Sequence, residues 1–122
     1  MNEQLKKVLA FHTKYKVKIS DQPAPLDADT AALRHRIMRE EVDEYLPEAT
    51  GANIEYLAKE LADVIYTVYG TVIAHGLHEK FDDVFAEVHR SNMTKEYDPI
   101  KPKKGATYTP ADIATIFTDY TR

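Results

Sequence analysis

The stretch that decides the fold is REEVDE, residues 39–44, and a second acidic motif, ELAD, follows it at residues 60–63. Both stretches lie in segments whose apolar residues recur with helical spacing, so each is expected to be part of a helix. Residues three apart share one face of a helix. This spacing pairs Glu41 with Glu44 in the first stretch and Glu60 with Asp63 in the second. The sequence therefore presents two acidic pairs on two neighbouring helices.

These acids interrupt a surface that is otherwise suited to burial. Leu33 and Ile37 form an apolar stripe that continues directly into Glu41. Two carboxylates about 5 Å apart repel by roughly 3 kcal/mol at an effective dielectric constant of roughly 20. A hard divalent cation bound by oxygen atoms removes this repulsion, and no histidine occupies a matching position. The pattern therefore predicts an oxygen-only site for Mg²⁺ or Mn²⁺ rather than a zinc or di-iron centre.

A simpler interpretation is a solvated, glutamate-rich helix that carries ion pairs with nearby lysine or arginine. Arg36 lies four residues before Glu40, and Lys59 lies beside the second acidic pair. The second pair, however, stands inside a strongly apolar helix. Acidic pairs on two adjacent helices are the arrangement that a metal site in a helical bundle requires, so the metal interpretation is favoured.

Length and composition define the class of protein. The chain has 122 residues, which predicts a single domain over residues 1–122. It has no cysteine, and its net charge of −4 argues against non-specific binding to nucleic acid. Residues 1–10 are too polar for a signal peptide, and no apolar run approaches the length of a membrane span. A cytoplasmic protein without a membrane partner is expected.

The order of elements predicts an all-α fold. Helices are expected over about residues 2–15, from Asp29 or Thr30 to a stop at residues 49–51 after weakening at Pro47, over 53–75 and over 79–95. Prolines keep the chain beyond Glu96 irregular, apart from one short helix within residues 110–117. The predicted architecture is a four-helix bundle with an irregular C-terminal tail.

The helix expected over residues 57–73 is apolar around most of its circumference. A helix of that kind is buried in the middle of a bundle or of an oligomer. A homodimer, or a homotetramer built as a dimer of dimers, is therefore predicted, with this helix near the interface.

Three further features have two interpretations each. Asn92 and Lys95 continue the apolar stripe of their helix, where they either contact an anion or cap the helix and complement its dipole. Lys104 lies in a basic loop that either reaches a polyphosphate or is merely solvated. His12, at the end of the first helix, suits packing or capping better than ligation.

Together these motifs resemble the MazG-like all-α nucleoside triphosphate pyrophosphohydrolases, a group that includes phosphoribosyl-ATP pyrophosphohydrolase. The signature of that group is EExxE followed by ExxD, which EEVDE at residues 40–44 and ELAD at residues 60–63 reproduce. FH at residues 11–12, DVIY at 63–66 and VHRSNMTK at 88–95 extend the resemblance, which covers most of residues 8–113. The tail departs from the pattern, because it lacks the Asp-Gly-Lys stretch of other members.

The resemblance implies Mg²⁺-dependent hydrolysis of a nucleoside triphosphate to monophosphate and pyrophosphate, as in house-cleaning of the nucleotide pool. Glu40 or Glu41 would orient or deprotonate the attacking water, with Glu41 preferred. The carboxylates that would hold the metal ions are Glu41, Glu44, Glu60 and Asp63. The positions that would bind substrate are Asn92, Lys95, Lys104, Tyr108 and His12.

Two alternatives stay open at this point. The first is hydrolysis of phosphoribosyl-ATP, which the extra N-terminal helix and the tail disfavour. The second is a non-catalytic helical interaction module whose acids form surface ion pairs.

Overall fold

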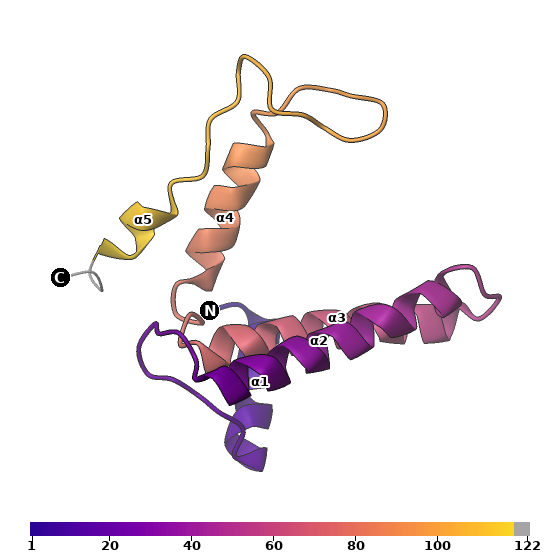
Figure 1. The fold of residues 1–122 in the computed structure, drawn as a ribbon, viewed down its shortest axis with the longest axis vertical. Coiled ribbons are helices and arrows are strands. Elements are labelled where there is room, and N and C mark those ends of the chain that lie inside the picture. The colour runs from indigo at the N-terminus through magenta and orange to yellow at the C-terminus, as the bar shows by residue number, and fades with distance from the viewer. Residues whose placement is uncertain (119–122) are drawn as a thin grey trace. The chain divides into compact units, whose positions relative to one another are not determined.

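The computed structural model describes residues 1–118 and is helical throughout its regular structure (Figure 1). Its elements are α1 (Glu3–Tyr15), α2 (Ala28–Ala49), α3 (Ile54–Ala74), α4 (Phe81–Asn92) and α5 (Ile113–Ile116). Residues 1–118 contain no strand, and an isolated antiparallel bridge joins Glu96 to Lys103. The predicted all-α class is confirmed. No helix in this part of the chain has the length and apolarity needed to span a membrane.

Side chains at the helix starts satisfy backbone N–H groups that have no partner within the helix. Asn2 accepts a hydrogen bond from Leu5 N, at 2.8 Å, and Asn53 caps α3 in the same way. The second helix begins at Ala28, before the expected Asp29 or Thr30, because the carboxylate of Asp27 accepts the bond from Thr30 N. It ends at Ala49, where the sequence predicts the stop, and Pro47 does not end it earlier, since a proline in the last turns removes only one helical hydrogen bond.

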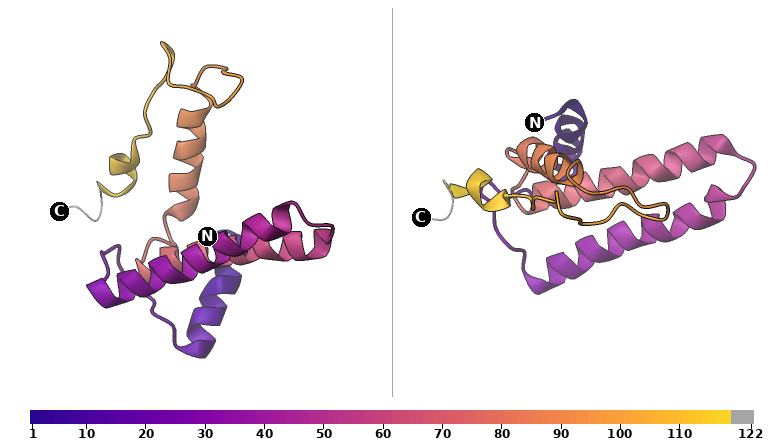
Figure 2. Two further views of the ribbon diagram at one scale, coloured as in Figure 1. Left: turned by 45° about the vertical axis from the view of Figure 1, so that its right-hand side comes forward. Right: turned by 90° about the horizontal axis from the view of Figure 1, so that it is seen from above.

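The chain forms two compact units, and the first comprises residues 2–78. In it α2 and α3 run side by side as an antiparallel hairpin, and α1 packs against α3 (Figure 2). The buried apolar side chains come from α1 and from the last turns of α3. They are Leu5, Val8, Val72, Ile73 and Ala74. The core therefore lies at the end of the hairpin where α2 begins and α3 ends.

The first half of α3 is apolar but uncovered. Leu61 is 46% exposed and Ile65 is 53% exposed, although the sequence of this helix suits burial all round. Helices α1 and α2 thus leave one side of α3 open along its first three turns.

The second unit contains Met1 and residues 79–118 of the described chain. Here the end of α4 holds the irregular tail through hydroxyl groups. Ser91 Oγ donates to Thr109 O at 2.7 Å, and Thr94 Oγ1 accepts from Thr109 N at 2.9 Å. The SNMTK segment at residues 91–95 therefore has a structural function, which is to fix the tail beside α4.

The turn after α3 depends on a glycine. Gly76 has a φ of +71°, and a Cβ atom there would overlap the carbonyl group of Gln22. We expect Gly76→Ala to lower the free energy of unfolding by about 1–2 kcal/mol or more, the cost of a left-handed non-glycine residue, in a urea titration. Gly51→Ala is the matched control, because the nearest atom to its Cβ would be 3.5 Å away. Equal unfolding midpoints for the two variants would contradict this account.

Candidate metal centre

The two acidic motifs meet across the α2–α3 hairpin. Glu41 from α2 and Glu60 and Asp63 from α3 each place one carboxylate oxygen so that these atoms lie within 4.8 Å of one another. All three side chains are half-buried. Glu44, one turn beyond Glu41, is hydrogen-bonded to Glu60. The structure thus brings together all four carboxylates in which the sequence predicted metal ligands, and we call these four residues the acid cluster.

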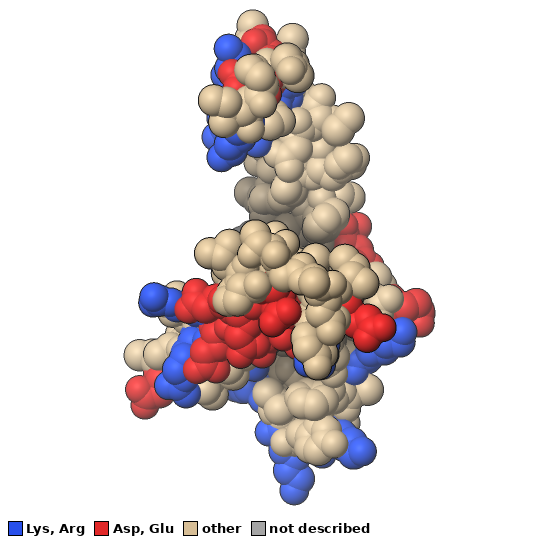
Figure 3. Space-filling view, turned by 90° about the vertical axis from the view of Figure 1, so that its right-hand side faces the viewer, with Lys and Arg blue, Asp and Glu red and all other residues tan. Residues whose placement is uncertain are grey.

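Two oxygen atoms of the acid cluster are buried without a partner. They are Oε2 of Glu41 and Oε2 of Glu60. Burying an unpaired carboxylate oxygen is costly, because its hydration is lost and nothing replaces it. Figure 3 shows one large patch of acidic side chains on this face of the molecule, with smaller acidic groups apart from it. The arrangement fits a bound cation, which supplies these oxygen atoms with a partner.

The pKa values respond to the same crowding. Burial is the largest cause that raises the pKa of Glu41, followed by the charges of Glu44, Asp63 and Glu60. Burial is also the largest cause that raises the pKa of Glu60. The next causes are its hydrogen bond with Glu44 and the repulsion between these two carboxylates. Glu41 and Glu60 therefore hold their protons to a higher pH than an isolated glutamate does.

The ion pairs expected from the sequence are present, but they provide a cationic partner for only some of the acids. Lys59 Nζ lies 2.8 Å from Asp63 Oδ2, and this contact raises the pKa of the lysine. Arg36 lies 3.9 Å from Glu40, whose side chain is 63% exposed. Glu40 therefore points away from the acid cluster, whereas Glu41 points into it.

His12 lies in the core, apart from the acid cluster. Only 2% of it is exposed, and its Nδ1 is 2.9 Å from the carbonyl oxygen of Lys18. Burial is the main cause that lowers its pKa, and the nearby charge of Arg34 lowers it further. These contacts correspond to the packing interpretation, and a role of His12 in binding substrate stays a prediction.

The remaining predicted substrate residues belong to the second unit. Lys104 Nζ lies 5.1 Å from the centre of the Tyr108 ring. A hydrogen bond with Ser91 is the largest cause that lowers the pKa of Tyr108, and the charges of Lys104 and Lys95 add to it. Lys95, Lys104 and Tyr108 are therefore neighbours, while Asn92 is exposed in the last turn of α4. Their approach to the acid cluster stays a prediction.

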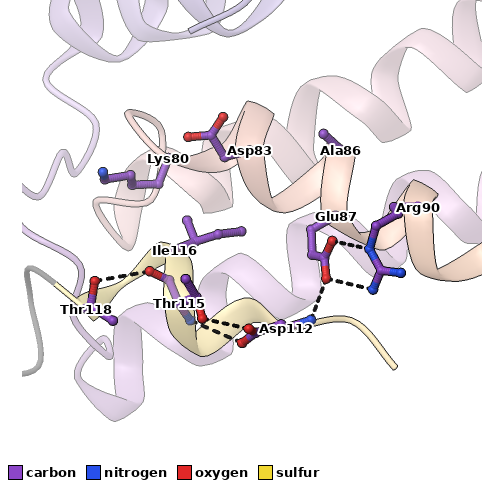
Figure 4. A pocket seen from close by; sticks show the side chains of 9 residues that line it. All are labelled: Lys80, Asp83, Ala86, Glu87, Arg90, Asp112, Thr115, Ile116 and Thr118. Carbon is purple, nitrogen blue, oxygen red and sulfur yellow. Dashed lines mark hydrogen bonds and ion pairs between the residues drawn. The ribbon is translucent and has the colours of Figure 1, made fainter. Parts of the chain in front are cut away.

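A groove of about 620 Å³ lies between α4 and α5, and no predicted site residue lines it (Figure 4). Glu87 accepts two hydrogen bonds from Arg90 and one from Asp112 N, and these bonds lower its pKa to about 2. Arg90 also donates to the carbonyl oxygen of Pro110, at 3.0 Å. These contacts fasten the tail to α4, and the spacing of Glu87 and Arg90 was the only sign of them in the sequence.

Comparison with known families agrees with this geometry. The profile of the phosphoribosyl-ATP pyrophosphohydrolase family matches residues 8–92, which contain both acidic motifs and the whole acid cluster. The fold and the match together define an all-α pyrophosphohydrolase of the MazG-like superfamily. Within it, the chain belongs to the phosphoribosyl-ATP pyrophosphohydrolase family. No curated protein matches the chain.

The raised pKa of Glu41 has a measurable consequence in metal-free protein. The folded state holds more protons than the unfolded state between the ordinary pKa of 4.5 and the raised value, so the free energy of unfolding falls as pH rises through that window. We expect Glu41→Gln to remove part of this fall in urea titrations with a chelator present.

The control is Glu40→Gln, which removes the adjacent exposed carboxylate outside the cluster and so makes the same change in net charge. His12, whose lowered pKa acts with the opposite sign, contributes equally to all three proteins and cancels in the differences. Identical pH profiles for wild type and Glu41→Gln would contradict the raised pKa.

Proposed function

We propose that this protein is a Mg²⁺-dependent hydrolase that converts a nucleoside triphosphate to its monophosphate and pyrophosphate. The observation that carries the proposal is the acid cluster, with its two buried carboxylate oxygens that lack a partner. Membership of a pyrophosphohydrolase family supports the type of bond that is cleaved.

The donor set suits a hard cation. Glu41, Glu44, Glu60 and Asp63 offer only oxygen atoms, which Mg²⁺ and Mn²⁺ prefer and which zinc sites seldom use alone. When bound, Mg²⁺ would neutralise the cluster, contact the phosphate oxygens and lower the pKa of a coordinated water. The ion pair of Lys59 uses one oxygen of Asp63, so the second oxygen of that carboxylate remains for a metal.

Glu41 is the preferred general base. It lies within the cluster, where its carboxylate can accept a proton from a water molecule held beside the metal ions. The water oxygen attacks a phosphorus atom of the α–β anhydride, the water proton passes to the carboxylate, and the bridging bond breaks to release pyrophosphate. Glu40 is the second choice, since it is exposed and faces Arg36.

The second unit offers donors for a polyphosphate. Lys95 and Lys104 place two cations beside the hydroxyl group of Tyr108. Cations and hydroxyl groups are the usual partners of phosphate oxygens. We propose that these residues contact the phosphates of the substrate and that Asn92 contacts phosphate or ribose.

Phosphoribosyl-ATP is the second candidate substrate, and the family match favours it. Its hydrolysis breaks the same kind of phosphoanhydride bond, so the acid cluster has the same function in both reactions. The two candidates differ only in the group attached to the α-phosphate, and a substrate panel therefore distinguishes them.

The decisive experiment measures pyrophosphate release from phosphoribosyl-ATP and from canonical and modified nucleoside triphosphates, with Mg²⁺. We expect turnover of at least one compound and a loss of about 10² to 10⁴ in rate for Glu41→Gln, the usual cost of removing a general base. Glu40→Gln should retain most of the activity, and the reverse pattern would assign the base to Glu40. Inactivity of the wild type on the whole panel would instead support the non-catalytic interaction module.

We also propose that the protein is a homodimer that buries the open side of α3. A groove of about 400 Å³ lies between α1 and α3, and its lining is mostly apolar. It includes Val8, Ala62, Ile65, Tyr66 and Tyr69. Exposed apolar surface of this extent on a helix usually marks an interface between proteins.

Sedimentation at micromolar concentration should give a dimer or a dimer of dimers. Ile65→Glu places a charge in the groove and should shift the protein toward the monomer, because an unpaired charge is not buried at an interface. Ile100→Glu is the matched control, since Ile100 is 94% exposed and lies outside the groove. A compact wild-type monomer would contradict the proposed assembly.

A further inference from the structure

Arg34 is a buried cation on α2 that the sequence pattern did not single out. Only 7% of the residue is exposed. It donates from Nη2 to Thr67 O at 3.0 Å and from Nε to Thr71 Oγ1 at 3.2 Å, so both hydrogen bonds cross to α3. Within residues 1–118 Arg34 forms no ion pair, and burial lowers the pKa of its guanidinium group.

A buried cation with neutral partners is a poor source of stability. The desolvation of the guanidinium opposes the energy of its hydrogen bonds, and replacement by an apolar side chain is often neutral or favourable. The best-attested function of such groups is to select one register between helices, because only one register satisfies them.

Arg34 lies at a fixed offset from the acid cluster on both helices. Glu41 follows Arg34 by seven residues on α2, and Glu60 precedes Thr67 by seven residues on α3. Seven residues are two helical turns, about 10 Å, and return to the same face. Because the two helices are antiparallel, the bond from Arg34 to Thr67 and the approach of Glu41 to Glu60 belong to one register.

A change of register would remove the metal ligands. Sliding α3 by one residue along α2 shifts it by about 1.5 Å and requires a rotation of about 100° to repack. Glu60 and Asp63 would then leave the face that Glu41 occupies, while the apolar contacts of α3, which is apolar nearly all round, would change little.

Gly70 and His12 confine the guanidinium group. A Cβ atom at position 70 would lie 2.5 Å from Nη2 of Arg34 and 2.9 Å from Nε2 of His12. His12 is itself held by the carbonyl oxygen of Lys18 through Nδ1. The absence of a side chain on α3 at this point therefore leaves the space that Arg34 needs to reach Thr67.

We propose that Arg34 is a positioning residue that sets the register of α2 against α3 and thereby brings Glu41 opposite Glu60 and Asp63. The proposal rests on the proposed function only in taking the acid cluster as a cation site. It assigns to Arg34 no contact with the cation or with the substrate.

The test is Mn²⁺ binding by titration calorimetry to the full-length protein, well below the melting temperature, with circular dichroism to verify folding. We expect Arg34→Met and Arg34→Lys each to raise the Kd for Mn²⁺ about tenfold or more, the usual effect of losing a group that orients metal ligands. Lysine retains the charge but lacks the planar fork that makes both bonds.

The direction of the change in Mn²⁺ affinity distinguishes a role of Arg34 in setting the helix register from a purely electrostatic role. Arg34→Met removes a positive charge from the neighbourhood of a cation site, so a purely electrostatic role predicts tighter binding of Mn²⁺. Arg39→Met is the matched control on the same helix, because Arg39 is 71% exposed and pairs with Asp43 outside the cluster. It should leave Mn²⁺ affinity unchanged or slightly improved.

Gly70→Ala tests the same contact from the α3 side, because the added methyl group would displace the guanidinium group of Arg34. Alanine itself favours a helix, so the change does not weaken α3. It should weaken Mn²⁺ binding in the same way. Unchanged or tighter binding in folded Arg34→Lys and Gly70→Ala would overturn the proposal.

A wild type that binds no Mn²⁺ would count against the proposed function, and Arg34 would then be judged without metal. In chelator, the register is then measured directly as the distance between spin labels on two introduced cysteines, one on the exposed side of α2 and one on that of α3, because the chain has no cysteine of its own. An unchanged distance in Arg34→Met would overturn the positioning role.

Discussion

Repulsion among carboxylates on two different helices is the constraint on which this structure depends. Helices are stiff, so Glu41 cannot move away from Glu60 and Asp63 without a change in the packing of α2 against α3. Something must hold the helices together at the acid cluster against this repulsion. In the first unit that support comes from the other end of the hairpin, where α1 covers the last turns of α3 with Leu5 and Val8.

The separation of core and acid cluster along one hairpin has a functional logic. The last turns of α3, at Val72 and Ile73, are buried and determine stability, whereas its first turns carry the acids and exposed apolar side chains. A site that lies away from the core can hold destabilising charges, because their cost is offset by packing elsewhere. The exposed side of α3 is then available for a second copy of the chain.

In the second unit, the SNMTK segment both holds the tail and carries Lys95, one of the residues predicted to bind substrate. In the SNMTK segment, Ser91 and Thr94 bind the tail through their hydroxyl groups, and this fixes Tyr108 beside Lys95. The family match ends at residue 92, so most of this unit lies outside it. The family match therefore assigns no function to Lys95 and Lys104, the two cations beside Tyr108. Their positive charges are suited to binding phosphate.

The positions of the helices and the spacing of acids within each helix were determined by the sequence alone. These features depend on local rules: periodicity of apolar residues, capping by Asn2 and Asn53, and the separation of i and i+3 on one face. Local rules also failed where a competitor stood nearby, as when Asp27 rather than Asp29 capped α2. Contacts between helices were decided only in the tertiary structure. The apolar stripe that precedes Glu41 predicted that this residue turns inward, but only the packing of the helices brings its oxygen atoms close to those of Glu60 and Asp63. Arg34 likewise becomes important only because α3 buries it.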